Sequence, residues 1–172
     1  MATSLLTPNE ASVVKAEQRA GKYLVFHLGA EEFGIQVQKV REIMGVQDIT
    51  QVPQTPPYVK GVINLRGKVI PVVDLRLKFN MPAKEYTQRT CIIVVQVKSG
   101  STLLLMGIVV DEVSEVITMA AGDIEDTPDF GAHVATNYIL GMAKIKDKVK
   151  ILLDINEVLT SQELHGIEAV AK

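Results

Sequence analysis

The sequence carries two weakly similar copies of one pattern, in the same order along the chain. Residues 33–43 recur 73 positions later as residues 106–116, and residues 61–75 recur 80 positions later as residues 141–155. Matches that keep their order indicate one duplicated β-rich unit, and the seven-residue difference in spacing indicates a longer loop in the second copy. The chain is therefore expected to form two related lobes.

The composition fits a globular protein and argues against nucleic acid as a partner. Of the 172 residues, 47% are hydrophobic and 22% are charged, as in ordinary folded domains. The 18 basic and 20 acidic side chains give a net charge of −2, so no excess of cations is left to neutralise phosphates. Four Tyr, four Phe and no Trp offer few rings on which single-stranded bases could stack.

The cysteine content and the hydrophobic runs indicate a cytosolic protein. A single cysteine cannot close an intramolecular disulfide, and residues 1–10 lack the basic start and apolar run of a signal peptide. The longest run without a polar residue, residues 103–110, is far shorter than the roughly 18 residues of a membrane span. Any association with a membrane is expected to go through a partner.

The first copy reads as a hairpin, a short helix and a further strand. Residues 23–28 and 33–37 are rich in aromatic and β-branched side chains and flank a glycine-containing turn. From residue 37 to residue 44 the apolar residues follow a helical spacing, which predicts a short helix. Residues 46–52 are expected as a strand, and the proline-rich residues 53–57 as a stiff connection.

The middle of the first copy predicts a tight hairpin. Residues 61–65 and 68–73 are apolar runs separated by two residues, which places Arg66 at the hairpin tip. Pro71 argues for an edge strand or a bulge at its position. Asp74 is expected to cap a short helix.

The second copy repeats this plan and ends in an expected helix. Residues 90–97 and 103–110 flank a Gly/Ser turn, and residues 123–129 form an acidic loop. Residues 138–145 and 149–153 make the matching hairpin, with Lys146 and Asp147 at its tip. A capping box at residues 154–157 predicts a final helix.

About five short strands in each half favour a mainly β fold of two small barrels. A barrel of about 70 residues is marginal alone, so the two lobes are expected to share a hydrophobic seam. The expected boundaries are a flexible tail at 1–21, one domain at 22–165 and a second tail at 166–172. Within that domain the first lobe covers mainly 22–85, the second mainly 88–153, and the C-terminal helix 154–165.

The pair Asp74 and Asp154 invites comparison with a two-lobed aspartic hydrolase, in which two carboxylates share a proton. The residues that follow each aspartate, Leu75 and Ile155, are not the small hydroxyl residues which that chemistry needs. Capping of short helices explains both aspartates better.

Other candidate catalytic or metal-binding residues remain isolated in the sequence. His27, His133 and His165 have no companion at helical or hairpin spacing, so the sequence assembles neither a metal site nor a catalytic base. Cys91 opens an apolar strand and lacks a neighbouring base. The acidic loop 123–129 has neither the glycine nor the final glutamate of a calcium loop. We therefore expect no enzyme activity, no metal and no cofactor.

The remaining candidates are surface features. Arg66 is either a solvated tip residue or a contact for a partner. Val40, Arg41 and Glu42 place an apolar side chain beside opposite charges, which suits either a core edge or a docking face. The residues alone leave both alternatives open.

Several motifs resemble the CheW family of bacterial chemotaxis coupling proteins. They are Tyr23-Leu24-Val25-Phe26, Phe33-Gly34-Ile35, Lys39-Val40-Arg41-Glu42-Ile43, Gly61-Val62-Ile63-Asn64-Leu65-Arg66-Gly67, Val69-Ile70-Pro71-Val72-Val73-Asp74-Leu75-Arg76 and Gly107-Ile108-Val109-Val110-Asp111. The likeness runs from about Tyr23 to Leu159, and the segment from Asn64 to Arg76 is its most specific part.

The resemblance implies a fold of two intertwined five-stranded barrels and an adaptor function without catalysis. CheW-like proteins connect the cytoplasmic tips of methyl-accepting receptors to the regulatory domain of the histidine kinase CheA, and they can form rings with it. This implies a cytoplasmic protein recruited to receptor arrays at the inner membrane. Family positions for receptor binding match Val40, Glu42, Gly61 and Arg66, whereas the resemblance assigns no kinase-binding residues here.

Four alternative functions differ in how well they fit the sequence. We expect neither an ATP-binding kinase region nor a receiver domain in this chain, which separates it from the kinase and from CheV-type proteins. A CheW-like adaptor of a surface-motility or biofilm pathway stays open. A small-ligand binding protein using the cleft between the lobes would need convergent polar groups.

Overall fold

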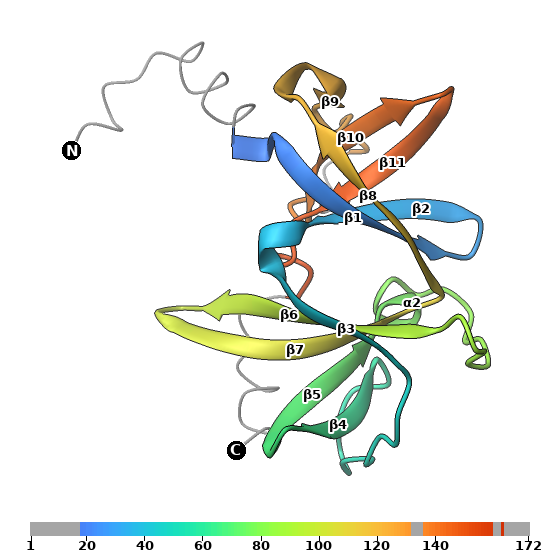
Figure 1. The fold of residues 1–172 in the computed structure, drawn as a ribbon, viewed down its shortest axis with the longest axis vertical. Helices are drawn as coiled ribbons and strands as arrows, with labels where there is room; N and C mark the ends of the chain where they lie inside the picture. Colours follow the sequence, from blue (N-terminus) through green and yellow to red (C-terminus); the bar gives the residue numbers. More distant parts are fainter. Residues whose placement is uncertain (1–17, 132–135, 160–162, 164–172) are drawn as a thin grey trace.

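The computed structural model describes residues 18–131, 136–159 and 163, which form two β-sheets shown one above the other in Figure 1. Sheet A has the strand order β8-β1-β2-β11-β10-β9, and sheet B has the order β3-β6-β7-β5-β4. The strands are β1 (Gly21–Leu28), β2 (Glu31–Gln36), β3 (Val40–Gly45), β4 (Val59–Leu65), β5 (Lys68–Asp74), β6 (Cys91–Ser99), β7 (Thr102–Val110), β8 (Glu112–Met119), β9 (Ile124–Glu125), β10 (Ile139–Ile145) and β11 (Lys148–Leu153). Short helical turns are η2 (Val37–Lys39), α2 (Leu75–Lys78) and η3 (Ala121–Asp123).

The two copies of the repeat exchange strands, so the lobes are intertwined. The first-copy hairpin β4–β5 joins sheet B through the second-copy strand β7, and the second-copy hairpin β10–β11 joins sheet A through β2. Likewise β3 pairs with β6, and β8 pairs with β1. Neither sheet is built from one contiguous half of the chain. The lobe boundaries at 22–85 and 88–153 stay a prediction.

The strand registers follow the internal repeat. The parallel pair of β5 and β7 sets Val72 opposite Gly107, and the parallel pair of β11 and β2 sets Leu152 opposite Gly34. These four residues are matched positions of the two copies. The repeat seen in the sequence is therefore an approximate twofold symmetry of the fold, which confirms the duplicated architecture.

Three apolar clusters form the core. The largest contains residues of both sheets, among them Phe26, Leu153, Ile93 and Ile108, and fills the seam between the lobes. A second cluster is confined to sheet B and the segments around it, and a third to sheet A. Each sheet therefore curls around its own small core, while the shared cluster holds the lobes together.

Both predicted hairpin tips are confirmed. Arg66 and Gly67 have φ values of 51° and 87°, and Lys146 and Asp147 have φ values of 50° and 65°. Two successive positive φ values make the turn that matches the twist of a two-residue hairpin. Arg66 therefore occupies a backbone region that costs a non-glycine residue free energy.

The predicted helix at residues 37–44 is wrong beyond its first turn. Residues Val37–Lys39 form a 3-10 turn, and β3 then pairs with β6. In this strand burial alternates: Glu42 is more buried than its neighbours, and Ile43 is 44% exposed. Because the strand turns a carboxylate inward and an isoleucine outward, its hydrophobic pattern does not follow the period of a strand.

Two further local predictions also differ from the structure. Residues 46–52 form no strand, and only Thr50 makes a bridge, to Val62. Pro71 lies in a strand with neighbours on both sides rather than at an edge, but the ladder from β5 to β7 begins only at Val72. The proline thus precedes the part of the strand that donates to β7.

The ends of the described chain pack on the lobes. Arg19, in the segment expected as a tail, is buried and donates from Nη1 to Asp126 Oδ1 at 2.8 Å and to the Leu140 carbonyl at 3.0 Å. Residues 154–159 form turns and not the expected helix, because they close the edge of the shared core. Glu163 is helical, while the rest of the expected helix and most of both tails lie outside the described residues.

Candidate functional site

The structure brings Glu42 and Arg66 together. Glu42 lies on β3 at one edge of sheet B, and Arg66 lies at the tip of the β4–β5 hairpin at the other edge. Arg66 Nη2 donates to Glu42 Oε1 at 2.7 Å, with side-chain exposures of 76% and 28%. The ion pair links the two edges of the curled sheet, and the exposed guanidinium remains open to a partner.

One oxygen of this carboxylate remains without a partner. Glu42 Oε2 is buried and has no hydrogen-bond donor among the described residues. An unsatisfied buried carboxylate oxygen costs free energy. A site that keeps such an atom is a candidate for completion by another molecule.

The tip arginine is held by its own hairpin. Asn64 Oδ1 accepts a hydrogen bond from the Gly67 backbone N–H at 2.8 Å, which closes the turn around Arg66. This explains the Asn64-Leu65-Arg66-Gly67 motif, because the asparagine fixes the conformation that projects the arginine.

Val40 lies on the same strand as Glu42. It pairs with Val95, is half-buried, and packs against the shared apolar cluster. The register shifts between Val40 and Glu42, so that Arg41 forms a bulge. Val40 therefore packs on the shared core and lies on the strand that carries Glu42 of the ion pair.

Gly61 acts through the backbone. Its φ is +139°, and an added Cβ would lie 2.0 Å from the carbonyl oxygen of Thr50. Thr50 and Val62 exchange two backbone hydrogen bonds of 2.9 Å at this point. Gly61 thus lets the connection before β4 lie against the hairpin that presents Arg66.

The second lobe lacks the ion pair. Its matched residues are Glu115 and Lys146, and no ion pair joins them within the part of the chain that the structure describes. Exposed apolar residues are nevertheless matched: Ile43 with Val116, and Val69 with Val149. The two lobes therefore offer similar apolar surfaces but different charges.

Sequence reasoning missed a second ion pair, which lies at the lobe seam. Arg76 Nη1 donates to Asp111 Oδ2 at 2.7 Å, and both side chains are nearly buried, with exposures of 13% and 11%. The Gly29 backbone N–H also donates to Asp111 Oδ2 at 2.7 Å. Arg76 and Asp111 both lie in motifs that resemble the CheW family, but no local sequence pattern indicates that the two side chains pair.

The capping function predicted for Asp74 is confirmed. Asp74 Oδ1 accepts from the backbone N–H of Arg76 at 2.9 Å and of Leu77 at 3.4 Å. Asp154 accepts from the Asn156 N–H at 3.1 Å. No hydrogen bond joins the two aspartates in the described structure, so each serves its own turn.

The Tyr86 hydroxyl donates to Asp74 Oδ2 at 3.0 Å, and burial, followed by the nearby carboxylate, raises the pKa of Tyr86. Above the ordinary pKa of 10.0 the unfolded chain loses this proton first, so stability falls as the pH rises further. We expect Tyr86→Phe to lose less stability than the wild type between about pH 9 and pH 11. Urea unfolding at both pH values checks this, and equal losses would contradict it.

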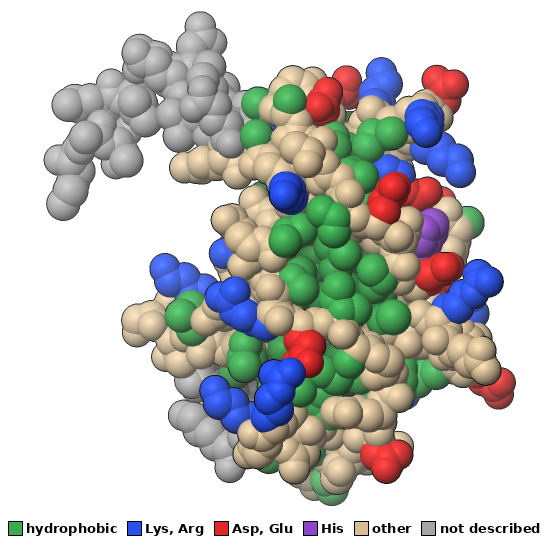
Figure 2. Space-filling view, in the orientation of Figure 1, with side chains coloured by type: hydrophobic (Ala, Val, Ile, Leu, Met, Phe, Trp, Pro, Cys, Tyr) green, Lys and Arg blue, Asp and Glu red, His purple; other side chains and the backbone are tan. Residues whose placement is uncertain are grey.

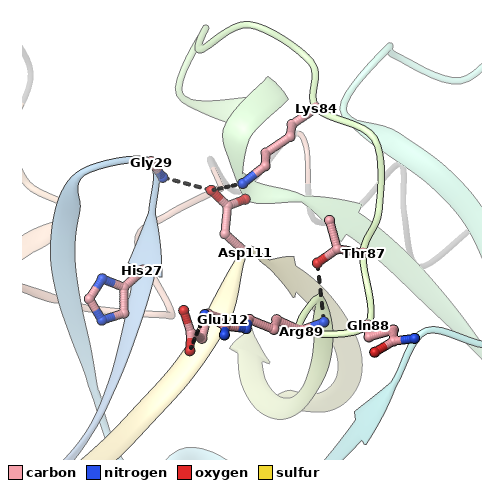
Figure 3. A pocket seen from close by; sticks show the side chains of 8 residues that line it. All are labelled: His27, Gly29, Lys84, Thr87, Gln88, Arg89, Asp111 and Glu112. Atoms are coloured by element: carbon pink, nitrogen blue, oxygen red, sulfur yellow. Dashed lines mark hydrogen bonds and ion pairs between the residues drawn. The ribbon is translucent and has the colours of Figure 1, made fainter.

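A polar hollow of about 490 Å³ lies at the seam (Figure 3). It is lined by His27, Gly29, Lys84, Thr87, Gln88, Arg89, Asp111 and Glu112. Its charges face each other: Lys84 lies 4.0 Å from Asp111, and Arg89 lies 3.7 Å from Glu112. Because these groups are paired within the chain, the hollow does not favour the small-ligand alternative.

The described histidine and cysteine candidates do not come together in a common site. His27 lies on β1, while His133 and His165 lie outside the described residues. Cys91 is a free, half-buried thiol, and within the described ranges no three His, Cys, Asp or Glu side chains form a group that could hold a metal. No helix in the same ranges has the length and hydrophobicity of a membrane span.

The fold and the candidate site define a duplicated, two-lobed β protein whose candidate residues lie on an outer surface. The family model described as CheW-like domain matches residues 22–163. The chain is 38% identical to the chemotaxis protein CheW of Klebsiella aerogenes over 94% of this chain and 95% of that one. It is 37% identical to CheW of Bacillus subtilis, over 86% and 92%.

A solved structure agrees with these comparisons. The scaffolding protein TtCheW of Thermoanaerobacter tengcongensis superposes with a TM-score of 0.73 and 32% identity, covering 84% of this chain and 97% of that one. The chain belongs to the CheW-like family, and it is an adaptor of chemotaxis signalling.

Proposed function

We propose that this chain couples methyl-accepting chemotaxis receptors to the histidine kinase CheA, without a reaction of its own. The observation that carries the proposal is the Glu42–Arg66 ion pair on an exposed edge of sheet B, at positions that match the family's receptor-binding residues. The family membership and the relatives named as chemotaxis and scaffolding proteins support it. Recruitment to receptor arrays at the inner membrane is part of the same proposal.

The receptor surface is an apolar area edged with charge. Figure 2 shows an exposed hydrophobic area around β3 and β8, two strands that lie at the front of the molecule in Figure 1. These edge strands carry Val40 and Val113, which are half-buried on the shared core, and the exposed Ile43 and Val116. An amphipathic helical hairpin would bury its apolar stripe here and set its polar flank against Arg66.

The kinase contacts are proposed at the two barrel ends. Val69 and Val149, at matched places of the two hairpins, are 53% and 48% exposed. A partner with the same duplicated fold could join one end of this chain to the opposite end of its own, and such a heterologous contact can close into rings. The different charges of the two lobes favour this unequal pairing over a symmetric one.

The first test is Arg66→Ala. If the arginine is a binding hot spot, the variant should bind a receptor cytoplasmic hairpin about 2 kcal/mol, or roughly 30-fold, more weakly. Stability should change by less than about 1 kcal/mol, because a largely exposed ion pair contributes little to folding. Isothermal titration and urea unfolding measure the two quantities.

The matched control is Lys146→Ala, which removes the cation at the tip of the other hairpin. This variant should leave receptor affinity unchanged, because Lys146 has no ion-pair partner in the described structure and lies on the other lobe. Wild-type receptor affinity of a folded Arg66→Ala protein would sink the receptor assignment. Titration against the kinase regulatory domain tests the adaptor function separately, since a small-ligand carrier should not bind that domain.

A further inference from the structure

A second hollow lies between η2, β3 and the outer end of the β6–β7 hairpin. Its volume is about 290 Å³, and it is lined by Gln38, Lys39, Arg41, Gln96, Lys98, Leu103 and Asn156. Figure 2 shows Lys and Arg side chains gathered near η2 and the ends of β6 and β7, beside the hydrophobic area over β3 and β8. The lining contains three cations and no carboxylate.

These cations are not neutralised by the described chain. No described carboxylate forms an ion pair within 4.0 Å of Lys39, Arg41 or Lys98. Lys39 does act on the carboxylate of Asp154, but the two groups form no ion pair within 4.0 Å. The side chains that line the hollow therefore carry an excess of positive charge.

Neutral groups hold the hollow in shape. Arg41 donates to the side-chain oxygen of Gln96 and, at 3.4 Å, to the carbonyl of Gln38. Asn156 Oδ1 accepts from the Lys98 backbone N–H at 2.9 Å. An arginine oriented by neutral acceptors keeps its full charge for an incoming anion.

The internal repeat provides a comparison within the molecule. The hollow of Figure 3 is its counterpart, because Asp111 and Glu112 occupy the places of Gln38 and Lys39. There the chain itself supplies cations for both acids, as described above. In the counterpart the charges are positive, and the described chain supplies no acids for them.

We propose that this cationic hollow receives acidic side chains of the receptor hairpin that docks on β3, an inference that rests on the proposed function. Lys39 and Arg41 line the hollow and flank Val40 on β3, so the hollow borders the surface on which the receptor hairpin is proposed to dock. Leu103, 62% exposed on its rim, offers an apolar contact beside the charges. The expected occupant is a helix with carboxylates beside an apolar residue.

The test is the triple variant Lys39→Gln, Arg41→Gln, Lys98→Gln in the full chain. We expect its dissociation constant for a receptor cytoplasmic hairpin to rise about tenfold at low salt. At about 0.5 M salt, where exposed charges are screened, the difference should fall below about twofold. The control triple variant, Lys144→Gln, Lys146→Gln, Lys148→Gln, removes the same charge from the β10–β11 hairpin of sheet A and should bind like the wild type.

The outcomes separate this inference from the proposed function. If Arg66→Ala weakens receptor binding and the triple variant does not, the hollow is excluded while the receptor surface stands. Equal losses in both triple variants would show an effect of net charge only, and a loss confined to the kinase regulatory domain would assign the hollow to the other partner. Each of these three results overturns the inference. Thermal unfolding confirms that each variant is folded.

Discussion

Glu32→Leu should destabilise the protein by about 3 kcal/mol, because it leaves a buried lysine without its counter-ion. Lys150, on β11, has a side-chain exposure of only 7%, and its ammonium donates to the carboxylate of Glu32 on β2, which is 18% exposed. The pair joins the second-copy hairpin to a first-copy strand across their parallel ladder. Removing one member of a buried pair costs more than the pair contributes.

The internal repeat supplies the matched control. In sheet B the residues at the places of Lys150 and Glu32 are Ile70 and Leu105, which belong to or pack against the apolar core of that sheet. The double variant Glu32→Leu, Lys150→Ile copies this apolar pair into sheet A. It should fold with a stability within about 1 kcal/mol of the wild type, because an apolar pair can replace a buried ion pair at little cost.

Lys150→Ile alone should cost less, about 2 kcal/mol, because Glu32 is more exposed than its partner. Lys148 also lies near enough to lower the pKa of Glu32. Urea unfolding of the four proteins completes a double-mutant cycle. Additive losses in the double variant would contradict the proposed coupling.

The same pair predicts a pH dependence. The hydrogen bond from Lys150, the largest cause, lowers the pKa of Glu32 below its ordinary 4.5. As the pH falls, the unfolded chain binds the proton first, so this stabilisation is complete above about 4.5 and is lost towards the lower folded pKa. The wild type should therefore lose more stability than the double variant between pH 5 and about pH 3.

Local chemistry made part of the fold predictable. The tip at Arg66 follows from a two-residue gap between apolar runs, and the tip at Lys146 follows from the match of the second hairpin to the first. The Asp74 cap follows from its place before a short helical stretch. The repeat itself predicted two related lobes with a shared seam, which the largest apolar cluster confirms. These features depend on residues close together in the chain.

Pairings across the chain were not predictable from residue patterns. Strand exchange places β7 against β5 and β11 against β2, and no single copy records which partner it takes. The ion pairs Arg76–Asp111 and Lys150–Glu32 depend on this exchange. Sequence reasoning could only obtain the intertwining from the family resemblance.

The misread strand is part of the candidate site. In β3 the partly buried Glu42 and the exposed Ile43 reverse the pattern that core packing would select. Local rules fail most often where a protein gives up packing for binding. The wrong helix prediction at residues 37–44 therefore falls on the surface that the proposed function uses.

Gly61→Ala should destabilise the protein by about 3 kcal/mol or more, because two costs add. A φ of +139° is strained for any residue with a Cβ. The new methyl group would also lie 2.0 Å from the Thr50 oxygen and 2.7 Å from the Thr50 carbonyl carbon. Both obstacles are backbone atoms, so the chain before β4 must move and the Thr50–Val62 hydrogen bonds must break.

Receptor binding should fall with this change even in the molecules that remain folded. The displaced connection lies against β4, whose hairpin carries Arg66 and its ion pair with Glu42. We therefore expect a loss of receptor affinity at least as large as that of Arg66→Ala, measured at a temperature where unfolding curves show the variant to be folded. A shift of the β4–β5 hairpin moves the guanidinium away from Glu42 on β3 and also moves the rest of the hairpin surface, whereas Arg66→Ala removes only one side chain.

Gly45→Ala is the control for Gly61→Ala. Gly45 ends β3 on the same sheet, and an added Cβ there meets no atom within 4 Å. Its stability should match that of the wild type within about 0.5 kcal/mol. If Gly61→Ala were as stable as Gly45→Ala and bound the receptor hairpin like the wild type, the β4–β5 hairpin would tolerate displacement of the Thr50 segment. Gly61 would then have no part in positioning the receptor site.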